Sequence, residues 1–226
     1  MSTNGKMPEA WRRRLYIPAY TTTTAARYAK SNPRTVSYWH RGSRQLGPAL
    51  PGKQKRTALS YLQLVEVAFV ATFRNLGVSL QRLRKAHEYL SQMFEAEYPF
   101  ATYRLQTEGT HVLMDLLEVE PDRELEVIIA DKGGQLAWKP LVGKRFAEFD
   151  YEHDLAVVWH PVGRESEVAI DPRISFGAPQ VSGIPTWAVR GRKVAGESIE
   201  EIAEDFGLSD SQVKEALAFE QVVEAA

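Results

Sequence analysis

Residues 33–42 carry donor side chains in a pattern that suits nucleic-acid recognition. If the segment is a helix, Val36 and Trp39, three residues apart, form an apolar inward face. The opposite face then holds guanidinium and hydroxyl groups, which can contact base edges and phosphates in a major groove. We predict base contacts from this face, chiefly from Arg34 and Arg41 with Ser37 and Tyr38. The donor residues are Arg34, Thr35, Ser37, Tyr38 and Arg41.

Further basic side chains flank this segment. Residues 42–58 contain Gly, Pro and four cations without a helical period, which predicts a loop or a small β-wing. Its cations would lie on the phosphates beside the groove. The tract Arg12–Arg14 is either an arm for a minor groove or a solubilising tail. A basic helical bundle with a solvated surface is the alternative for the whole region. The loop cations are Arg44, Lys53, Lys55 and Arg56.

The charge distribution supports a nucleic-acid partner for one half of the chain. The 226 residues contain 28 Lys plus Arg and 29 Asp plus Glu, a net charge of −1. Residues 1–101 hold 16 basic and 5 acidic side chains, whereas residues 102–226 hold 12 basic and 24 acidic. Residues 1–60 alone hold 12 basic side chains and one acidic side chain. Such asymmetry predicts DNA for the first half and a different partner for the second.

No catalytic constellation is apparent. The chain has no cysteine, and its five histidines do not fall in a metal-ligand spacing. Asp150, Glu152, His153 and Asp154 resemble a metal or acid/base cluster, but a polar turn between two strands is the simpler interpretation. No run is long enough to span a membrane, and no secretory signal is visible. We expect a cytoplasmic protein that is not an enzyme and needs no cofactor or metal.

Helices are expected to position the donors in a first domain, residues 1–101. Thr21–Thr24 would cap a short helix, and Asn32-Pro33 would open the next one, which stops at Gly42. Two amphipathic helices follow, one over Leu62–Leu76 and one beginning after the cap Ser79.

The middle domain, residues 102–170, is predicted to be β-rich. Trp138, Tyr151 and Trp159 there either line a small pocket or pack in the core. The expected strands are Val112–Leu116, Glu126–Ala130, Ala147–Tyr151 and Leu155–Trp159.

The last domain, residues 171–226, is predicted to hold three helices, the last two joined by a short turn at Gly207–Ser209. Ser198 and Glu201 form a capping box. The final helix is acidic and would repel phosphates, so this domain is expected to bind protein or to dimerise. The fold class is therefore α+β, with a winged helix-turn-helix, a β-rich middle segment and a C-terminal helix-turn-helix-like domain of three helices. Candidate partner-binding residues are Arg190, Arg192, Glu200, Glu204 and Phe219.

The first domain resembles the MerR type of winged helix-turn-helix. The segment Thr35–Trp39 is similar to that family's recognition-helix motif, and Leu59–Val65 with Phe73–Leu80 is similar to its second helix pair. The resemblance covers about a third of the chain. MerR regulators continue into a long dimerisation helix, whereas this chain turns at Pro99 into the β-rich segment.

Residues 168–220 resemble small uncharacterised helical domains that are common in bacterial toxin–antitoxin operons. The combination of both ends is similar to VapB-type antitoxins, whose partners are PIN-like ribonucleases. The resemblance implies an autorepressor that binds operator DNA and masks a ribonuclease toxin. A homodimer is expected, because one short recognition helix reads few base pairs and a two-fold operator roughly doubles that number. The alternative is a stand-alone MerR-like or phage-type transcriptional regulator with a ligand-sensing β-rich domain. The motifs are Ile170–Arg173, Phe176–Pro179, Gly183–Thr186 and Ala195–Ala203.

Overall fold

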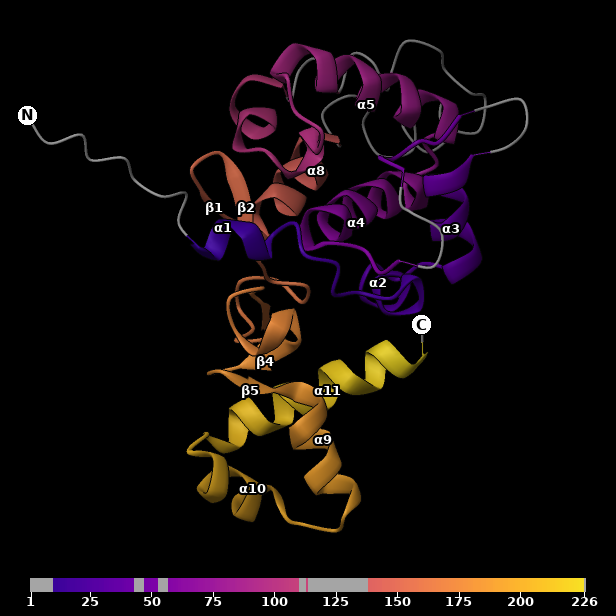
Figure 1. The fold of residues 1–226 in the computed structure, drawn as a ribbon. Helices are drawn as coiled ribbons and strands as arrows, with labels where there is room; N and C mark the ends of the chain where they lie inside the picture. The colour runs from indigo at the N-terminus through magenta and orange to yellow at the C-terminus, as the bar shows by residue number, and fades with distance from the viewer. Residues whose placement is uncertain (1–9, 43–46, 53–56, 110–112, 114–137, 226) are drawn as a thin grey trace, which may run out of the picture.

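The N-terminal part of the chain is a group of helices around one buried helix. The computed structural model describes residues 10–42, 47–52, 57–109, 113 and 138–225. Helix α4 lies at the centre of this group, with α5 on one side and α2 and α3 on the other (Figure 1). The helices are α1 (Ala10–Arg14), α2 (Thr22–Tyr28), α3 (Pro33–Arg41), α4 (Tyr61–Asn75) and α5 (Leu80–Phe94).

The predicted helix boundaries in this part are confirmed by their caps. The Thr21 side chain accepts a hydrogen bond from the Thr24 amide at 3.0 Å, and Asn32 Oδ1 accepts one from the Arg34 amide at 2.8 Å. Pro33 occupies the first turn of α3, where its missing amide hydrogen costs nothing. Gly42 ends that helix with a positive φ of 68°. Ser79 caps α5 as expected.

Helix α4 differs from the amphipathic helix that the sequence predicts. Every residue from Tyr61 to Ala71 is buried, because α2, α5, strand β2 (Leu155–Trp159) and the short helix η1 (Pro99–Ala101) all pack against it. The charged residue Glu66 lies within this stretch. Its Oε1 accepts a hydrogen bond from the Phe100 amide at 2.8 Å. A polar group so deep in a core needs such a partner.

The middle part contains more helix than expected. The described residues include η2 (Leu105–Gly109) and α8 (Trp138–Ala147), and only then β1 (Phe149–Glu152) and β2 (Leu155–Trp159). The strand expected at Ala147–Tyr151 therefore begins two residues later. Pro140 and Gly143 conceal α8 in the sequence, although Pro is tolerated in a first turn. Most of the strands expected over Val112–Leu116 and Glu126–Ala130 lie outside the described residues.

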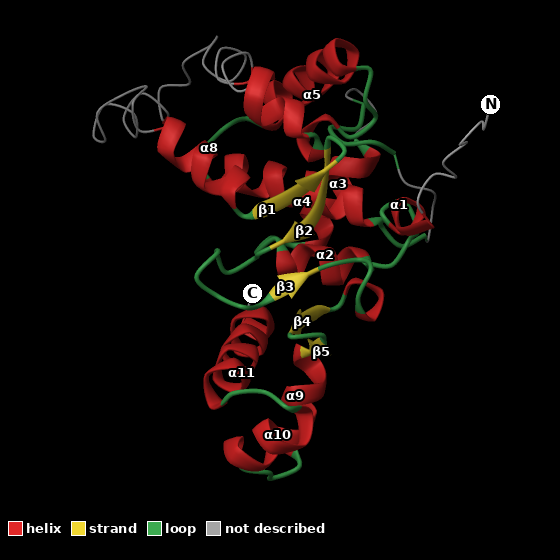
Figure 2. Cartoon of the chain, turned by 90° about the vertical axis from the view of Figure 1, so that its left-hand side faces the viewer, coloured by secondary structure: helices red, strands yellow, loops and turns green. Residues whose placement is uncertain are grey.

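One antiparallel sheet joins the middle part to the C-terminal part. Its strand order is β1-β2-β3-β4-β5, with β3 (Ala169–Ile170), β4 (Pro179–Val181) and β5 (Ile184–Pro185). Ile170 pairs with Pro179, so the expected domain boundary at residue 171 falls between two hydrogen-bonded strands. In Figure 2 the sheet runs from the large helical body to the three C-terminal helices.

The three C-terminal helices follow the prediction closely. They are α9 (Thr186–Val194), α10 (Ile199–Phe206) and α11 (Asp210–Ala225). Ser198 and Glu201 form the expected capping box, and Gly207 adopts the left-handed conformation that ends α10. Val189, Ile202 and Val213 are fully buried in a second hydrophobic core, separate from the one around α4. The architecture is mixed α+β.

Candidate nucleic-acid interface and junction pocket

Helix α3 presents its donors to solvent. Val36 is fully buried and Trp39 is 2% exposed, whereas Arg34, Thr35 and Arg41 are exposed and Tyr38 is 39% exposed. The helix is fixed from behind, because the Ala49 and Leu50 amides both donate to the Trp39 carbonyl oxygen, at 2.8 and 3.1 Å. The predicted orientation of the helix is therefore confirmed: its apolar residues face the core, four donor residues are exposed, and Ser37 is half-buried.

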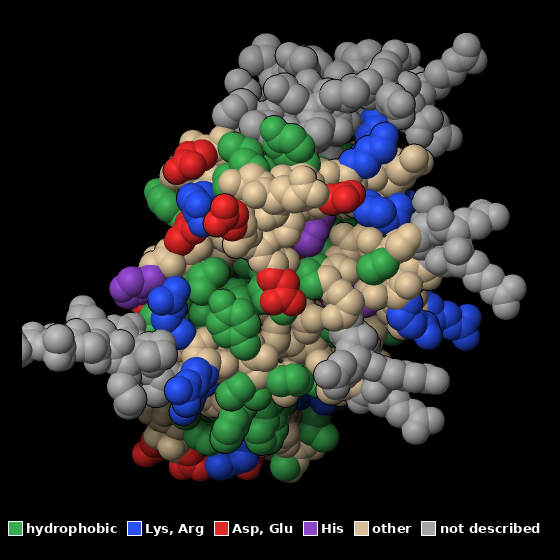
Figure 3. All heavy atoms as spheres, turned by 45° about the horizontal axis from the view of Figure 1, so that its top comes forward, with side chains coloured by type: hydrophobic (Ala, Val, Ile, Leu, Met, Phe, Trp, Pro, Cys, Tyr) green, Lys and Arg blue, Asp and Glu red, His purple; other side chains and the backbone are tan. Residues whose placement is uncertain are grey.

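Other cations lie near this face. Arg84 on α5 donates from Nε to the carbonyl oxygens of Gly47 and Pro48, at 3.0 and 3.2 Å, and so holds the loop that follows α3. Several Lys and Arg side chains lie on the right-hand side of Figure 3, which is the side where Figure 1 shows α3, and others lie on its left-hand side. The tract Arg12–Arg14 forms the last turn of α1, and Arg14 Nη1 donates to the Arg173 carbonyl oxygen at 2.7 Å. The loop cations Arg44, Lys53, Lys55 and Arg56 lie outside the described residues.

The acidic cluster after residue 149 is divided between strand β1, which holds Asp150 and Glu152, and the turn to β2, which holds His153 and Asp154. Each of its carboxylates pairs with a different cation: Asp150 with Arg164 (2.6 Å), Glu152 with Arg173 (2.7 Å) and Asp154 with Arg104 (2.8 Å). Partial burial raises the pKa of Asp150, but hydrogen bonds from His160 and Arg164 outweigh it and hold that pKa below its ordinary value. Among the described residues, no group of three or more His, Cys, Asp or Glu side chains could hold a metal ion.

Of the middle aromatic residues, Trp159 packs in the core, whereas Tyr151 is half-buried and lines a surface pocket. Trp159 is 1% exposed, stacks on Phe149 with ring centroids 5.8 Å apart, and donates from Nε1 to Glu148 Oε2 at 3.2 Å. Burial raises the pKa of the Tyr151 hydroxyl. The Trp138 side chain lies outside the described part. Of the two interpretations, core packing is therefore the one that holds for Trp159.

Two of the candidate partner-binding residues are occupied within the chain. Arg192 contacts Glu197 Oε1 at 2.5 Å, pairs also with Asp205, and lies over the Phe206 ring. Phe219 is only 6% exposed and packs against Tyr28 of α2, with ring centroids 6.1 Å apart. The other candidates lie nearer to solvent: Glu200 and Glu204 are exposed on α10, and Arg190 is half-buried on α9.

Helix α9 carries an exposed apolar stripe that the sequence analysis missed. Trp187 is 62% exposed and Val194, two turns later, is 76% exposed. Gly191 lies between them on the same face, while Thr186 and Val189 are buried on the other. The sequence signal is the spacing of seven residues between Trp187 and Val194, which places both side chains away from the core residue Val189.

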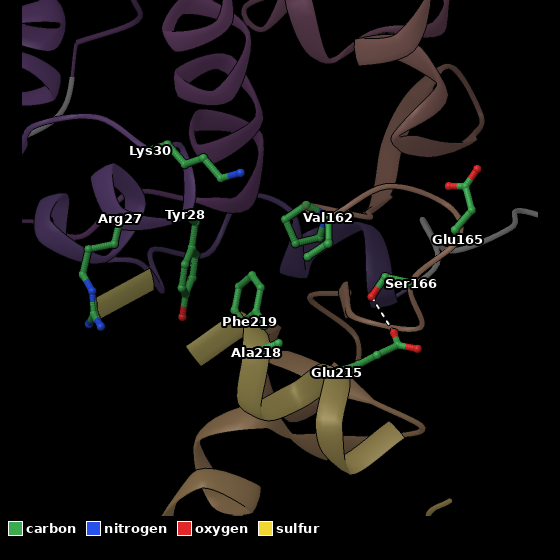
Figure 4. A pocket seen from close by; sticks show the side chains of 10 residues that line it. Arg27, Tyr28, Lys30, Val162, Glu165, Ser166, Glu215, Ala218 and Phe219 are labelled. Atoms are coloured by element: carbon green, nitrogen blue, oxygen red, sulfur yellow. Dashed lines mark hydrogen bonds between the residues drawn. The ribbon is translucent and has the colours of Figure 1, made fainter. Parts of the chain in front are cut away.

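A pocket of about 330 Å³ lies where the N-terminal and C-terminal parts meet (Figure 4). Tyr28 and Phe219 form one wall, Val162 and Pro161 form another, and Ala218 lies between them on α11. Lys30, Arg27, Glu165, Ser166 and Glu215 contribute the polar groups. The sequence could not reveal this pocket, because its walls come from three segments that only the fold brings together.

Comparison with known proteins finds similarity over most of the chain to a protein named as a putative antitoxin. A family model described as "Protein of unknown function (DUF433)" matches residues 168–219. The chain is 26% identical to a Mycobacterium tuberculosis protein named "Putative antitoxin VapB45", over 90% of this chain and 94% of that protein. A crystal structure of Rv2018 from Mycobacterium tuberculosis shares the fold, with a TM-score of 0.72 and 24% identity over 90% of this chain and 99% of the other. No helix in the described part is long and apolar enough to cross a membrane.

Proposed function

We propose that the protein is an autorepressing antitoxin. Its N-terminal part, a winged helix-turn-helix of the MerR type, binds operator DNA, and its C-terminal part binds and blocks a PIN-like ribonuclease toxin. The observation that carries the proposal is the outward row of donors on α3, whose apolar face is fully buried. The similarity of the whole chain to a protein named as an antitoxin supports the second half.

On DNA, the short helix α3 limits how much sequence one protomer reads. Its nine residues span about 13 Å at about 1.5 Å per residue, which covers only a few base pairs. Arg34 and Arg41 lie near the two ends of the helix and Tyr38 lies between them. A homodimer on a two-fold operator would double the contacted sequence, so we propose that the protein binds as a dimer.

Toxin binding is proposed for the C-terminal helices. The apolar stripe of α9, formed by Trp187 and Val194, suits an anchor in a protein interface, because aromatic residues there contribute much of the binding energy. Glu200 and Glu204 on neighbouring α10 are exposed carboxylates. A ribonuclease needs a cationic surface for its substrate, and these carboxylates would cover part of that surface.

Salt-dependent binding of the full-length protein to the DNA upstream of its own gene tests the first half. We expect tighter binding to this duplex than to a shuffled one, and affinity that falls steeply between low and physiological salt as phosphate counterions are released. Equal affinity for both duplexes would show that α3 does not read bases. An affinity for DNA that does not change with salt concentration would show that this face does not contact phosphates.

Co-purification with the product of the adjacent gene tests the second half. We expect a stable complex that inhibits the partner's ribonuclease activity and that is lost when residues 168–226 are removed. Survival of the complex after that truncation would refute the assignment to the C-terminal part. A stand-alone transcriptional regulator is the second candidate, favoured by the pocket between α2 and α11, and it predicts operator binding without any such complex.

A further inference from the structure

Lys30 has a backbone conformation that rarely suits its residue type. It follows α2 with a φ of 52°, in the left-handed region. The Lys30 amide donates to the Arg27 carbonyl oxygen at 3.1 Å, and the Ser31 amide donates to the Ala26 carbonyl oxygen at 2.8 Å. This pair of bonds is the Schellman motif, whose left-handed position is normally Gly or Asn. A lysine there is less stable than glycine, so its side chain calls for a functional explanation.

The backbone places the Lys30 amine at the junction pocket. In Figure 4 the side chain extends from α2 toward Val162, while Arg27 points to the other side of Tyr28. Lys30 is exposed, and no ion pair joins it to a carboxylate among the residues that the structure describes. The pocket therefore has a positive charge at its edge that forms no ion pair with Glu165 or Glu215, the two carboxylates that also line it.

The remainder of the pocket is apolar or already hydrogen-bonded. Tyr28, Val162 and Phe219 supply ring and methyl surface. Glu215 Oε2 accepts hydrogen bonds from Ser166 Oγ at 2.7 Å and from the Glu167 amide at 2.9 Å, so this oxygen already has partners within the chain. The Glu165 carboxylate points away from Phe219 and Val162 in Figure 4. An apolar interior with one cation at its edge is complementary to an apolar molecule with one negative group.

We propose that this pocket binds a small carboxylic acid with an aryl or branched aliphatic body. The carboxylate would pair with Lys30, and the body would lie between Tyr28, Val162 and Phe219. The volume of about 330 Å³ is at the lower end of the range for small-molecule pockets, which fits one ring with a short acidic tail. This site goes beyond the proposed function, because neither DNA nor toxin takes part in it.

Such a ligand would be coupled to the DNA-binding face. The pocket wall at Tyr28 belongs to α2, which packs directly on α3, and the wall at Phe219 belongs to α11. A molecule that binds both walls stabilises the present arrangement of these helices relative to any other.

The test is titration of the full-length protein with 3-phenylpropionate, followed by calorimetry and by ligand-observed NMR. The matched controls are 3-phenylpropanamide and 3-phenylpropylamine, which share the body and lack the negative charge. We expect the acid to bind about tenfold more tightly than either control, since a charge-assisted pair with Lys30 is lost.

Three variants locate the site. Lys30→Asn keeps a residue that tolerates the left-handed backbone and should weaken binding of the acid about tenfold. Lys214→Gln, an exposed lysine of α11 outside the pocket, should leave it unchanged. Ala218→Leu, at an exposed position that lines the pocket, should abolish binding by filling the space.

Equal binding of acid and amide, or unchanged binding by Lys30→Asn, would overturn the assignment of the carboxylate to Lys30. Unchanged binding by Ala218→Leu would overturn the pocket itself. Absence of binding by the acid at millimolar concentration would overturn the proposal as a whole. None of these results bears on operator or toxin binding, so failure here and failure of the proposed function are distinguishable.

Discussion

The Tyr20 hydroxyl donates a hydrogen bond to the Gly177 carbonyl oxygen at 3.0 Å, across 157 residues of sequence. Tyr20 is 3% exposed, and burial raises the pKa of its hydroxyl, so the group stays a donor. This bond and the Tyr28–Phe219 contact fasten the N-terminal helices to the C-terminal part, and the continuous sheet joins the middle part to it. The N-terminal and C-terminal parts of the chain are therefore mechanically connected.

Gly177→Ala should destabilise the protein strongly. A Cβ atom at this position would lie 2.0 Å from the Tyr20 hydroxyl oxygen, and the φ of +78° is itself strained for alanine. We expect the free energy of unfolding to fall by about 2–4 kcal/mol in urea titrations. Gly183→Ala is the matched control, because its φ is +86° but no atom lies within 4 Å. It should cost only the backbone strain, about 1–2 kcal/mol. Equal losses for both variants would show that the contact with Tyr20 is unimportant.

Glu66 is expected to be a structural requirement of the first core. Its side chain is fully buried, with Oε1 bonded to the Phe100 amide and Oε2 2.9 Å from His87 Nε2. Glu66→Ala would leave a buried amide without an acceptor and should lower the free energy of unfolding by about 2–4 kcal/mol. Glu66→Gln keeps an acceptor oxygen and should lose clearly less. Chemical denaturation measures the free energy of unfolding of both variants. A similar decrease in the two would mean that the negative charge of Glu66 matters more than its hydrogen bond.

Local signals explain how much of the fold the sequence predicts. The caps at Asn32 and Ser198, and the glycines that follow α3 and α10, are determined by neighbours within four residues, so those helices were placed correctly. Helix α8 was missed because Pro140 and Gly143 oppose helix locally, while burial of Phe146 against Phe69 stabilises it through tertiary contact. Such contacts override local propensity.

The candidate sites also differ in whether local sequence signals or long-range packing determine them. The outward face of α3 follows from the period of one helix, so it could be predicted. From the sequence, Phe219 and Arg192 are expected to be free to bind a partner. In the fold, Phe219 packs against Tyr28 across the junction, and Arg192 pairs with Asp205 on the next helix. The period of their own helices does not reveal these contacts. The junction pocket depends on the same long-range packing.

Arg34→Ala and Arg41→Ala should each weaken operator binding by about 1–3 kcal/mol if these side chains contact bases. Both arginines are exposed, and the cap from Asn32 uses the Arg34 amide rather than its side chain, so thermal stability should not change. Fluorescence anisotropy with the upstream duplex measures the effect. Lys214→Ala, a lysine on acidic α11, is the control that should bind as the parent does. Parental affinity in both arginine variants would contradict the assignment of α3.

Asp150 should make a small, pH-dependent contribution to stability. Its pKa is lowered in the folded protein, so the stabilisation is fully present above the unfolded pKa of about 4 and is lost as the pH falls through the lower folded value. The side chain is 41% exposed, which limits the effect of Asp150→Asn at neutral pH to below about 1 kcal/mol. Parent and variant should converge in unfolding experiments as the pH falls through the folded pKa of Asp150. A difference that persists unchanged in acid would exclude this carboxylate as its origin.

Trp187→Ala should separate partner binding from folding. Because the side chain is 62% exposed, its removal should change the free energy of unfolding by less than about 0.5 kcal/mol. If the α9 stripe is the toxin-binding surface, the same change should weaken the complex by about 2 kcal/mol or more, as loss of an aromatic anchor does. Val194→Asp should act in the same direction, since it places a charge in the desolvated centre of the interface.

Arg192→Gln is the informative control, because Arg192 is already paired with Glu197 and Asp205. Quantitative co-purification with the adjacent gene product distinguishes the two surfaces. Loss of the complex in Arg192→Gln but not in Trp187→Ala would move the interface from the exposed stripe of α9 to the charged end of that helix.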